Sequence, residues 1–160
     1  MSLPDDFLKA IGRITVNFSH LEFEVFFLIW PLLDSDQEAA RVVSDMLSFR
    51  QKCELINSLC QLRATDKKEI EGLGDLTKKL DHVGLERNRL IHSVWAVGDT
   101  DAPVLSMGKK SSIKVTLQDL KKLGDLIAET SRQVTKFTSN VCVRFPGLME
   151  PRKDPYRIVK

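Results

Sequence analysis

The sequence predicts an all-α fold, an up-and-down bundle of four or five helices with a small β-hairpin or flap inserted at about residues 94–116. Apolar residues recur at alternating spacings of four and three along several long segments, as on amphipathic helices. The period shortens only between residues 94 and 116, where apolar runs of about four residues alternate with turn residues. A length of 160 residues suits one domain.

The first expected helix runs from about Pro4 to Leu33. Proline suits a first helical turn, and Asp5 and Asp6 complement the helix dipole there. Pro31 should kink or end the helix. Because aromatic residues widen the apolar surface near its end, we expect this helix to be covered on more than one side, by the bundle or by a second subunit. Its main stripe comprises Phe7, Ile11, Ile14, Phe18, Leu21, Val25, Leu28 and Leu32.

Two further helices are expected at about 36–63 and 66–94. The turn at Asp34-Ser35-Asp36 should cap the earlier one, and a break near Gly72–Gly74 would interrupt the later one. The stripe of the earlier helix is Ala39, Val42, Met46, Phe49, Cys53, Ile56 and Cys60. The stripe of the later helix is Leu73, Leu76, Leu80, Val83, Leu90 and Val94.

Short strands are expected at 94–97, 104–107 and 113–116, followed by a long helix that Thr116 opens with Asp119 in its first turn. Helical signals fade after about Asn140, and prolines recur beyond it. We therefore expect one bundle domain over 1–140 and an extended basic tail over 141–160.

Composition indicates a cytoplasmic protein without a membrane segment. No positive, apolar leader begins the chain, and its most hydrophobic stretch, Phe23 to Leu33, is too short to span a bilayer. Cys53, Cys60 and Cys142 form no CxxC pair, so we interpret them as buried apolar residues in a reducing compartment. Acidic residues dominate the first 40 positions and basic residues those from Lys109 onward, which suits either a solvated surface or contact with a polyanion.

Several classes of chemistry are poorly supported. The chain has no phosphate-binding GxxxxGK[ST], no GxGxxG, no HExxH and no GxSxG. Its histidines, His20, His82 and His92, lack metal-ligand spacing. We expect neither a metal nor another cofactor.

One segment concentrates polar chemistry where an apolar stripe should continue: Glu86-Arg87-Asn88-Arg89-Leu90-Ile91-His92-Ser93. At about 100° per residue, Arg87 falls in the middle of the stripe, and Asn88 and His92 share a face at its edge. A guanidinium in an apolar stripe needs a carboxylate, a partner subunit or a bound anion. Arginine binds phosphate with a two-pronged fork, and histidine exchanges protons near neutral pH, so the set suits phosphodiester chemistry.

The first helix carries a second polar set, Arg13, Asn17, His20 and Glu24, at spacings of four, three and four. If the helices that carry the two sets packed together, Glu24 or the neighbouring Glu22 would reach Arg87, and Asn17 or His20 would approach His92. The residues expected to support the candidate site are therefore Glu22, Glu24, Asn17 and His20.

The string from Arg87 to His92 resembles the R-N-x-x-x-H signature of the HEPN superfamily. That resemblance implies a helical bundle that dimerises and brings two signatures into one composite cleft. It also implies a metal-independent endoribonuclease of a toxin–antitoxin or phage-defence system, with Arg87 and His92 catalytic and Asn88 supporting them. The partners would then be a second copy, an RNA substrate and an antitoxin or other regulatory protein.

Plainer interpretations stay open beside this one. Arg87 would otherwise form a buried ion pair with Glu22 or Glu24, and His92 would bond the backbone at a helix end. The chain would then be a non-catalytic HEPN-like module for dimerisation or for partner or nucleic-acid binding. The basic residues expected to guide RNA, which would otherwise be ordinary solvated side chains, are Arg89, Lys109, Lys110 and Lys114.

Overall fold

A computed structural model describes residues 3–33, 37–63, 67–97, 103–106 and 112–144. Within these ranges the chain forms five helices and three strands. In chain order they are α1 (Asp5–Leu33), α2 (Gln37–Asp45), α3 (Phe49–Arg63), α4 (Lys67–His92), β1 (Val94–Val97), β2 (Pro103–Ser106), β3 (Ser112–Lys114) and α5 (Leu117–Arg144).

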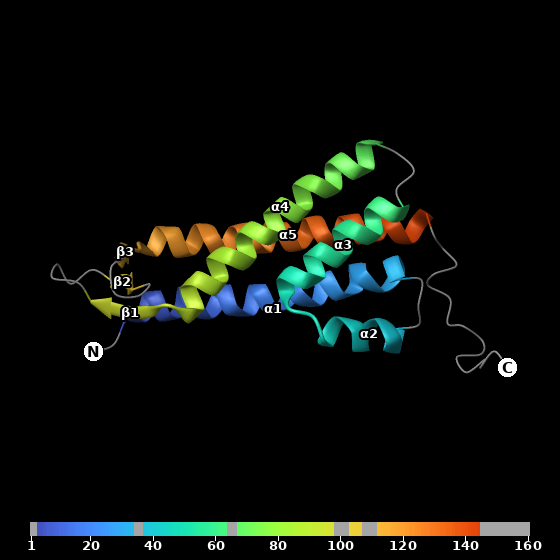
Figure 1. The fold of residues 1–160 in the computed structure, drawn as a ribbon. Helices are drawn as coiled ribbons and strands as arrows, with labels where there is room; N and C mark the ends of the chain where they lie inside the picture. Colours follow the sequence, from blue (N-terminus) through green and yellow to red (C-terminus); the bar gives the residue numbers. More distant parts are fainter. Residues whose placement is uncertain (1–2, 34–36, 64–66, 98–102, 107–111, 145–160) are drawn as a thin grey trace.

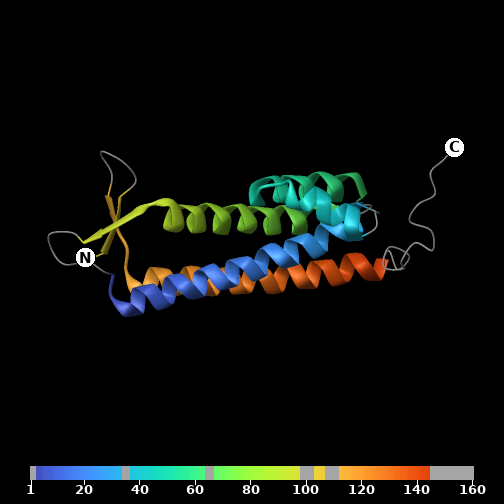
Figure 2. The same cartoon turned by 90° about the horizontal axis from the view of Figure 1, so that it is seen from below.

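The helices form two layers. The long helices α1 and α5 lie side by side and run in the same direction, and α4 crosses them together with α3 and the short α2 (Figures 1 and 2). The small sheet lies at the end of the bundle where α1 begins and α4 ends (Figure 1). The predicted all-α bundle with a small inserted β element is confirmed.

The apolar stripe of α1 forms the centre of the core. Six of its eight predicted positions are buried, and Phe7 and Ile11 are partly buried against the same cluster. Pro31 lies inside the helix and is buried, and α1 ends two residues after it. By length and composition alone α1 is also apolar enough to cross a membrane, a property that core helices of soluble proteins share.

The single helix expected at 36–63 is two helices, which makes that expectation wrong. The break falls at 46–48, where Ser48 caps α3: its amide and hydroxyl donate hydrogen bonds of 2.9 and 2.8 Å to Oε1 of Gln51. Such a reciprocal cap satisfies helix-end groups and favours a new start. Because of this break, the buried face of α2 does not continue that of α3. The helix α2 buries Ala40 and Ser44, while the expected core residues Val42 and Met46 are exposed.

The predicted stripe of α4 is buried over Leu73, Leu76, Leu80, Val83 and Leu90, and α4 runs unbroken through both glycines near its start. The expected break there is therefore wrong. The last helix continues to Arg144, beyond the predicted end near 140, and the rest of the expected tail lies outside the described residues.

The sheet is antiparallel in the order β1-β2-β3, with Trp95 paired to Leu105 and Leu105 to Ile113. Trp95 fastens it to the bundle, because the indole Nε1 donates a 3.2 Å hydrogen bond to the Leu90 carbonyl and the ring meets Phe7 edge-on at 6.4 Å. Trp95 thereby joins the end of α4 both to the sheet and to the start of α1.

Candidate functional site

The Arg87–His92 segment forms the last turns of α4, directly before the sheet (Figure 1). Leu90 is buried and anchors the segment in the core. Asn88 and His92, four residues apart, are both exposed. The helix therefore presents an amide and an imidazole to solvent from one face, at a position that the core holds in place.

Arg87 lies between this exposed face and the core. Its side chain is half-buried, with the guanidinium carbon 4.7 Å from the centre of the Phe18 ring on α1. Nη1 donates a 3.1 Å hydrogen bond to Oδ1 of Asn88, while Nε is buried and has no acceptor among the residues that the structure describes. The ring face attracts the cation, yet the guanidinium keeps unused hydrogen-bonding capacity.

The platform beneath Arg87 is built by three helices. The Phe18 ring is buried and lies 4.7 Å from the ring of Phe49, the first residue of α3. Phe49 in turn packs on Gly84 of α4, where an added Cβ would lie 2.9 Å from the ring. Only glycine lets α3 and α4 approach this closely, and that approach fixes the ring on which the guanidinium rests.

The polar set of α1 faces α5 and not α4. Arg13 pairs with Asp125 at 2.8 Å, and the Asn17 amide donates to the Gly124 carbonyl at 3.1 Å. His20 and Glu24, which lie one and two turns beyond Asn17 on α1, also have partners on α5. They are Ser131, 3.3 Å from Nδ1 of His20, and Thr135, whose hydroxyl donates to Glu24 at 2.9 Å.

The expected meeting of this set with Arg87 and His92 is therefore wrong. In the described part of the chain no ion pair joins Glu22 or Glu24 to Arg87. Glu22 is half-buried, and Glu24 lies 3.9 Å from His20 on its own helix. The four residues expected to support the site are not brought to it.

Two of the four residues expected to guide RNA lie within the described part of the chain. Arg89 is half-buried and lies 3.7 Å from Glu86, and Lys114 is exposed on β3. Lys109 and Lys110 lie outside the described residues.

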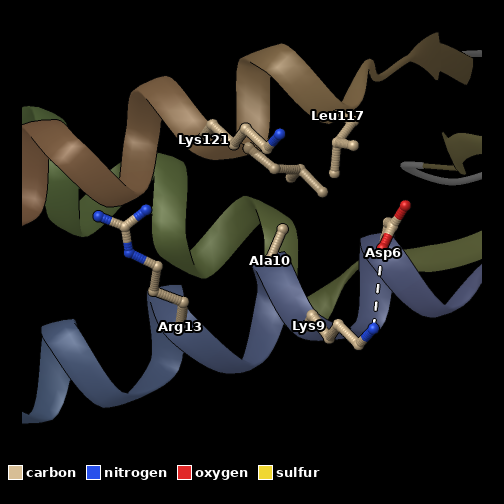
Figure 3. A pocket seen from close by; sticks show the side chains of 7 residues that line it. Asp6, Lys9, Ala10, Arg13, Leu117 and Lys121 are labelled. Carbon is tan, nitrogen blue, oxygen red and sulfur yellow. Dashed lines mark ion pairs between the residues drawn. The ribbon is translucent and has the colours of Figure 1, made fainter.

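A pocket of about 300 Å³ lies elsewhere, between the first turns of α1 and α5 (Figure 3). Its cations are largely matched, since Lys9 lies 3.9 Å from Asp6 and Arg13 binds Asp125. None of its lining residues belongs to the Arg87–His92 segment. They are Asp6, Lys9, Ala10, Arg13, Leu117, Leu120 and Lys121.

The thiols of α3 are buried apolar groups. Cys53 and Cys60 are both in the core, and burial, with smaller contributions from Asp81 and Glu54, raises the pKa of Cys53 to about 12. A thiol with so high a pKa is a poor nucleophile at neutral pH. Among the residues that the structure describes, no three His, Cys, Asp or Glu side chains are grouped to hold a metal ion.

Comparisons with protein-family models, with curated proteins and with solved structures found no match for this chain.

Proposed function

We propose that this chain is a metal-independent endoribonuclease of the HEPN type, which cleaves RNA in a composite cleft of a homodimer, as a toxin or a component of a defence system in the cytoplasm. The observation that carries the proposal is the exposure of Asn88 and His92 on the same turns of α4 as Arg87, whose guanidinium has no carboxylate partner among the described residues. An anion is the ligand that such an arrangement lacks.

Each group has a distinct part in the proposed reaction. His92, exposed at the end of α4, removes the proton from a ribose 2′-hydroxyl. Arg87 stabilises the negative charge that grows on the phosphate oxygens, from a position fixed over Phe18. Asn88 accepts a hydrogen bond from Arg87 and keeps its amide for the substrate.

The chemical step needs no metal, because the RNA supplies its own nucleophile. The 2′-oxygen attacks the adjacent phosphorus, and the bond from phosphorus to the 5′-oxygen of the next nucleotide breaks. The products are a 2′,3′-cyclic phosphate and a 5′-hydroxyl, whose proton comes from the second copy's imidazole or from water. Arg89 and the exposed Lys114, with Lys109 and Lys110, are proposed to attract the RNA backbone.

The test is incubation of the purified chain with single-stranded RNA in EDTA, alongside His92→Ala and Arg87→Ala. The proposal predicts cleavage that EDTA does not stop, product ends that carry a 2′,3′-cyclic phosphate, and loss of cleavage in both variants. His82→Ala is the matched control, because His82 is also exposed on α4 but lies ten residues before His92. Equal rates for the wild type and His92→Ala would exclude the nuclease.

A non-catalytic HEPN-like module is the alternative, and one observation favours it. The contact of Arg87 with Phe18 gives the guanidinium a packing role inside a single copy of the chain. In that case Arg87→Ala would lower the melting temperature, while RNA would stay intact with every protein. Retained RNA binding without cleavage would distinguish a binding module from a dimerisation module.

A further inference from the structure

The helix α1 carries a second apolar surface on the side opposite to the core. Counting from Leu8, the spacings are four, four and three, twice over, which is a repeat of 11 residues in three turns and follows one face of a nearly straight helix. We call this surface the outer face of α1. It consists of Leu8, Gly12, Val16, Ser19, Phe23, Phe27 and Trp30.

The outer face is open over most of its length. Leu8 is 50% exposed, Val16 69% and Phe23 56%, while Gly12 and Ser19 are exposed as well. No charged residue occupies any of its seven positions, although the polar set of the same helix lies close by. Isolated exposed apolar residues are ordinary, but a continuous uncharged series along a whole helix marks an interface.

The two halves of this face have complementary shapes. The N-terminal half contains the small residues Gly12 and Ser19, and a Cβ added at Gly12 would meet nothing within 4 Å. The C-terminal half contains a ladder of aromatic rings, with Phe23 4.7 Å from Phe27 and Phe27 6.4 Å from Trp30. A face with small residues towards one end and aromatic rings towards the other can pair with a copy of itself that runs the opposite way.

We propose that a second copy of this chain covers the outer face of α1, with the two α1 helices antiparallel and crossing near Ser19. Leu8 then meets Trp30 of the other copy, Gly12 receives Phe27, and Val16 packs on Phe23. A parallel pair would instead place Gly12 against Gly12 and leave a void, and it would press Phe23 against Phe23. Opposed helix dipoles also favour the antiparallel pair.

The size of the face suits a reversible dimer. With three large side chains at least half open and two aromatic residues partly open, it offers roughly 500 Å² per copy, on a scale where burying one aromatic side chain removes about 150–250 Å². Two copies would bury roughly 1,000 Å², near the lower limit for a specific interface. The dimer should therefore dissociate on dilution.

The outer face lies on the side of α1 opposite to Phe18 and Arg87, so this interface is separate from the composite cleft of the proposed nuclease and does not depend on catalysis. Its test is sedimentation of the full chain without RNA over a wide range of concentrations. We expect a concentration-dependent dimer for the wild type and for Leu62→Glu, a control at an apolar residue of α3 that is 80% exposed. Val16→Glu and Phe23→Lys, each alone, should weaken the dimer by roughly tenfold or more, since an unpaired charge is buried.

Mixing the two variants tests the antiparallel arrangement. In a mixed dimer, Glu at position 16 of one copy meets Lys at position 23 of the other, while Phe23 of the first copy keeps its contact with Val16 of the second. Dimers should therefore return in the mixture, and circular dichroism should show all variants folded. A wild type that stays monomeric, a mixture that fails to re-form dimers, or a monomer that binds phosphatidylcholine vesicles through this face would overturn the proposal. RNA cleavage is measured separately, so a failed nuclease and a failed interface give different results.

Discussion

The polar set of α1 and the Arg87–His92 segment of α4 contain the same residue types and have different environments. On α1, Arg13, Asn17, His20 and Glu24 each contact α5, and three of these contacts are 2.8–3.1 Å long. These residues fix the alignment of two long parallel helices (Figure 2). Their hydrogen bonds are already used within the fold.

On α4 the corresponding groups have few partners. Among the described residues, Arg87 donates a hydrogen bond only to its neighbour Asn88, its guanidinium lies over the Phe18 ring, and its Nε has no acceptor. Asn88 and His92 are exposed. An Arg-Asn-His set at helical spacing is therefore structural where a neighbouring helix provides its hydrogen-bond partners, and it becomes a candidate binding site where no helix does.

The largest expected effect is the difference in RNA cleavage between substitutions of His92 and of His20. His92→Ala should slow RNA cleavage by about 10²–10⁴-fold, the usual contribution of a general acid or base. His20→Ala should leave the rate unchanged, because His20 contacts Ser131 of α5. Rates are followed by the appearance of cyclic phosphate ends. Equal losses in both variants would mean that the comparison assigns the wrong set to the site.

A second effect concerns the platform beneath Arg87. Gly84→Ala should lower the free energy of unfolding by about 1–3 kcal/mol, because the new methyl group overpacks the Phe49 ring. Gly72→Ala, also on α4, meets nothing within 4 Å and should raise it by about 0.5–1 kcal/mol. Urea unfolding measures both. If Gly84→Ala left the free energy of unfolding unchanged, Phe49 would move aside freely and the rings beneath Arg87 would not be fixed in place.

A third prediction concerns the contribution of the Thr116–Asp119 cap, at the start of α5, to stability. The Asp119 carboxylate accepts hydrogen bonds from the hydroxyl and the amide of Thr116, at 2.6 and 3.0 Å, and these bonds lower the pKa of Asp119 below its ordinary 3.8. Because the folded state binds the proton less tightly, this contribution to stability is complete above pH 3.8 and is lost as the pH falls through the lowered pKa.

Thr116→Ala removes that cap and should cost about 1 kcal/mol at neutral pH. The difference between wild type and variant should shrink when thermal unfolding is repeated below pH 3.8. A difference that stays constant with pH would mean that the hydroxyl acts without the carboxylate.

The smallest effect belongs to the exposed end of the α1 set. Both partners of the Arg13–Asp125 pair are more than half exposed, so Arg13→Ala should cost no more than about 1 kcal/mol and should matter less as salt is added. Chemical denaturation at low and high salt measures this. A cost of several kcal/mol would show that the pair is central to the alignment of α1 and α5.

The sequence allowed prediction of the elements that spacing controls. The stripe of α1, the stripe of α4 as far as Leu90, the three short strands and the cap at Thr116 follow from local periodicity and turn chemistry, and the structure confirms them. Val94, which was also predicted to lie on the stripe of α4, is instead 69% exposed on β1. The split between α2 and α3 also had a local signal, the Ser48–Gln51 cap, but a continuous apolar period across it outweighed that signal. The apolar spacing is regular across both helices, but on α2 the apolar residues of this series, Ala39 and Val42, are exposed.

The candidate site was predictable only in part. Periodicity placed Arg87 within the stripe and the exposed pair beside it, and the structure agrees. It did not reveal which helix would face the polar set of α1, because spacing defines a face of one helix and not its neighbour. The choice between α4 and α5 depends on contacts between residues more than 100 positions apart, such as Arg13 with Asp125.

The most direct measurement follows the side-chain amides of Asn88 and Asn17 by NMR while a 2′-O-methyl oligoribonucleotide, which cannot be cleaved, is added. Asn88 lies beside Arg87, while Asn17 donates to the Gly124 carbonyl within the fold. We predict that the signals of Asn88 and the Arg87 Nε–H shift on binding and that those of Asn17 do not. Unmoved Asn88 and Arg87 signals at saturating oligonucleotide would contradict the claim that the unsatisfied groups of α4 receive the phosphate.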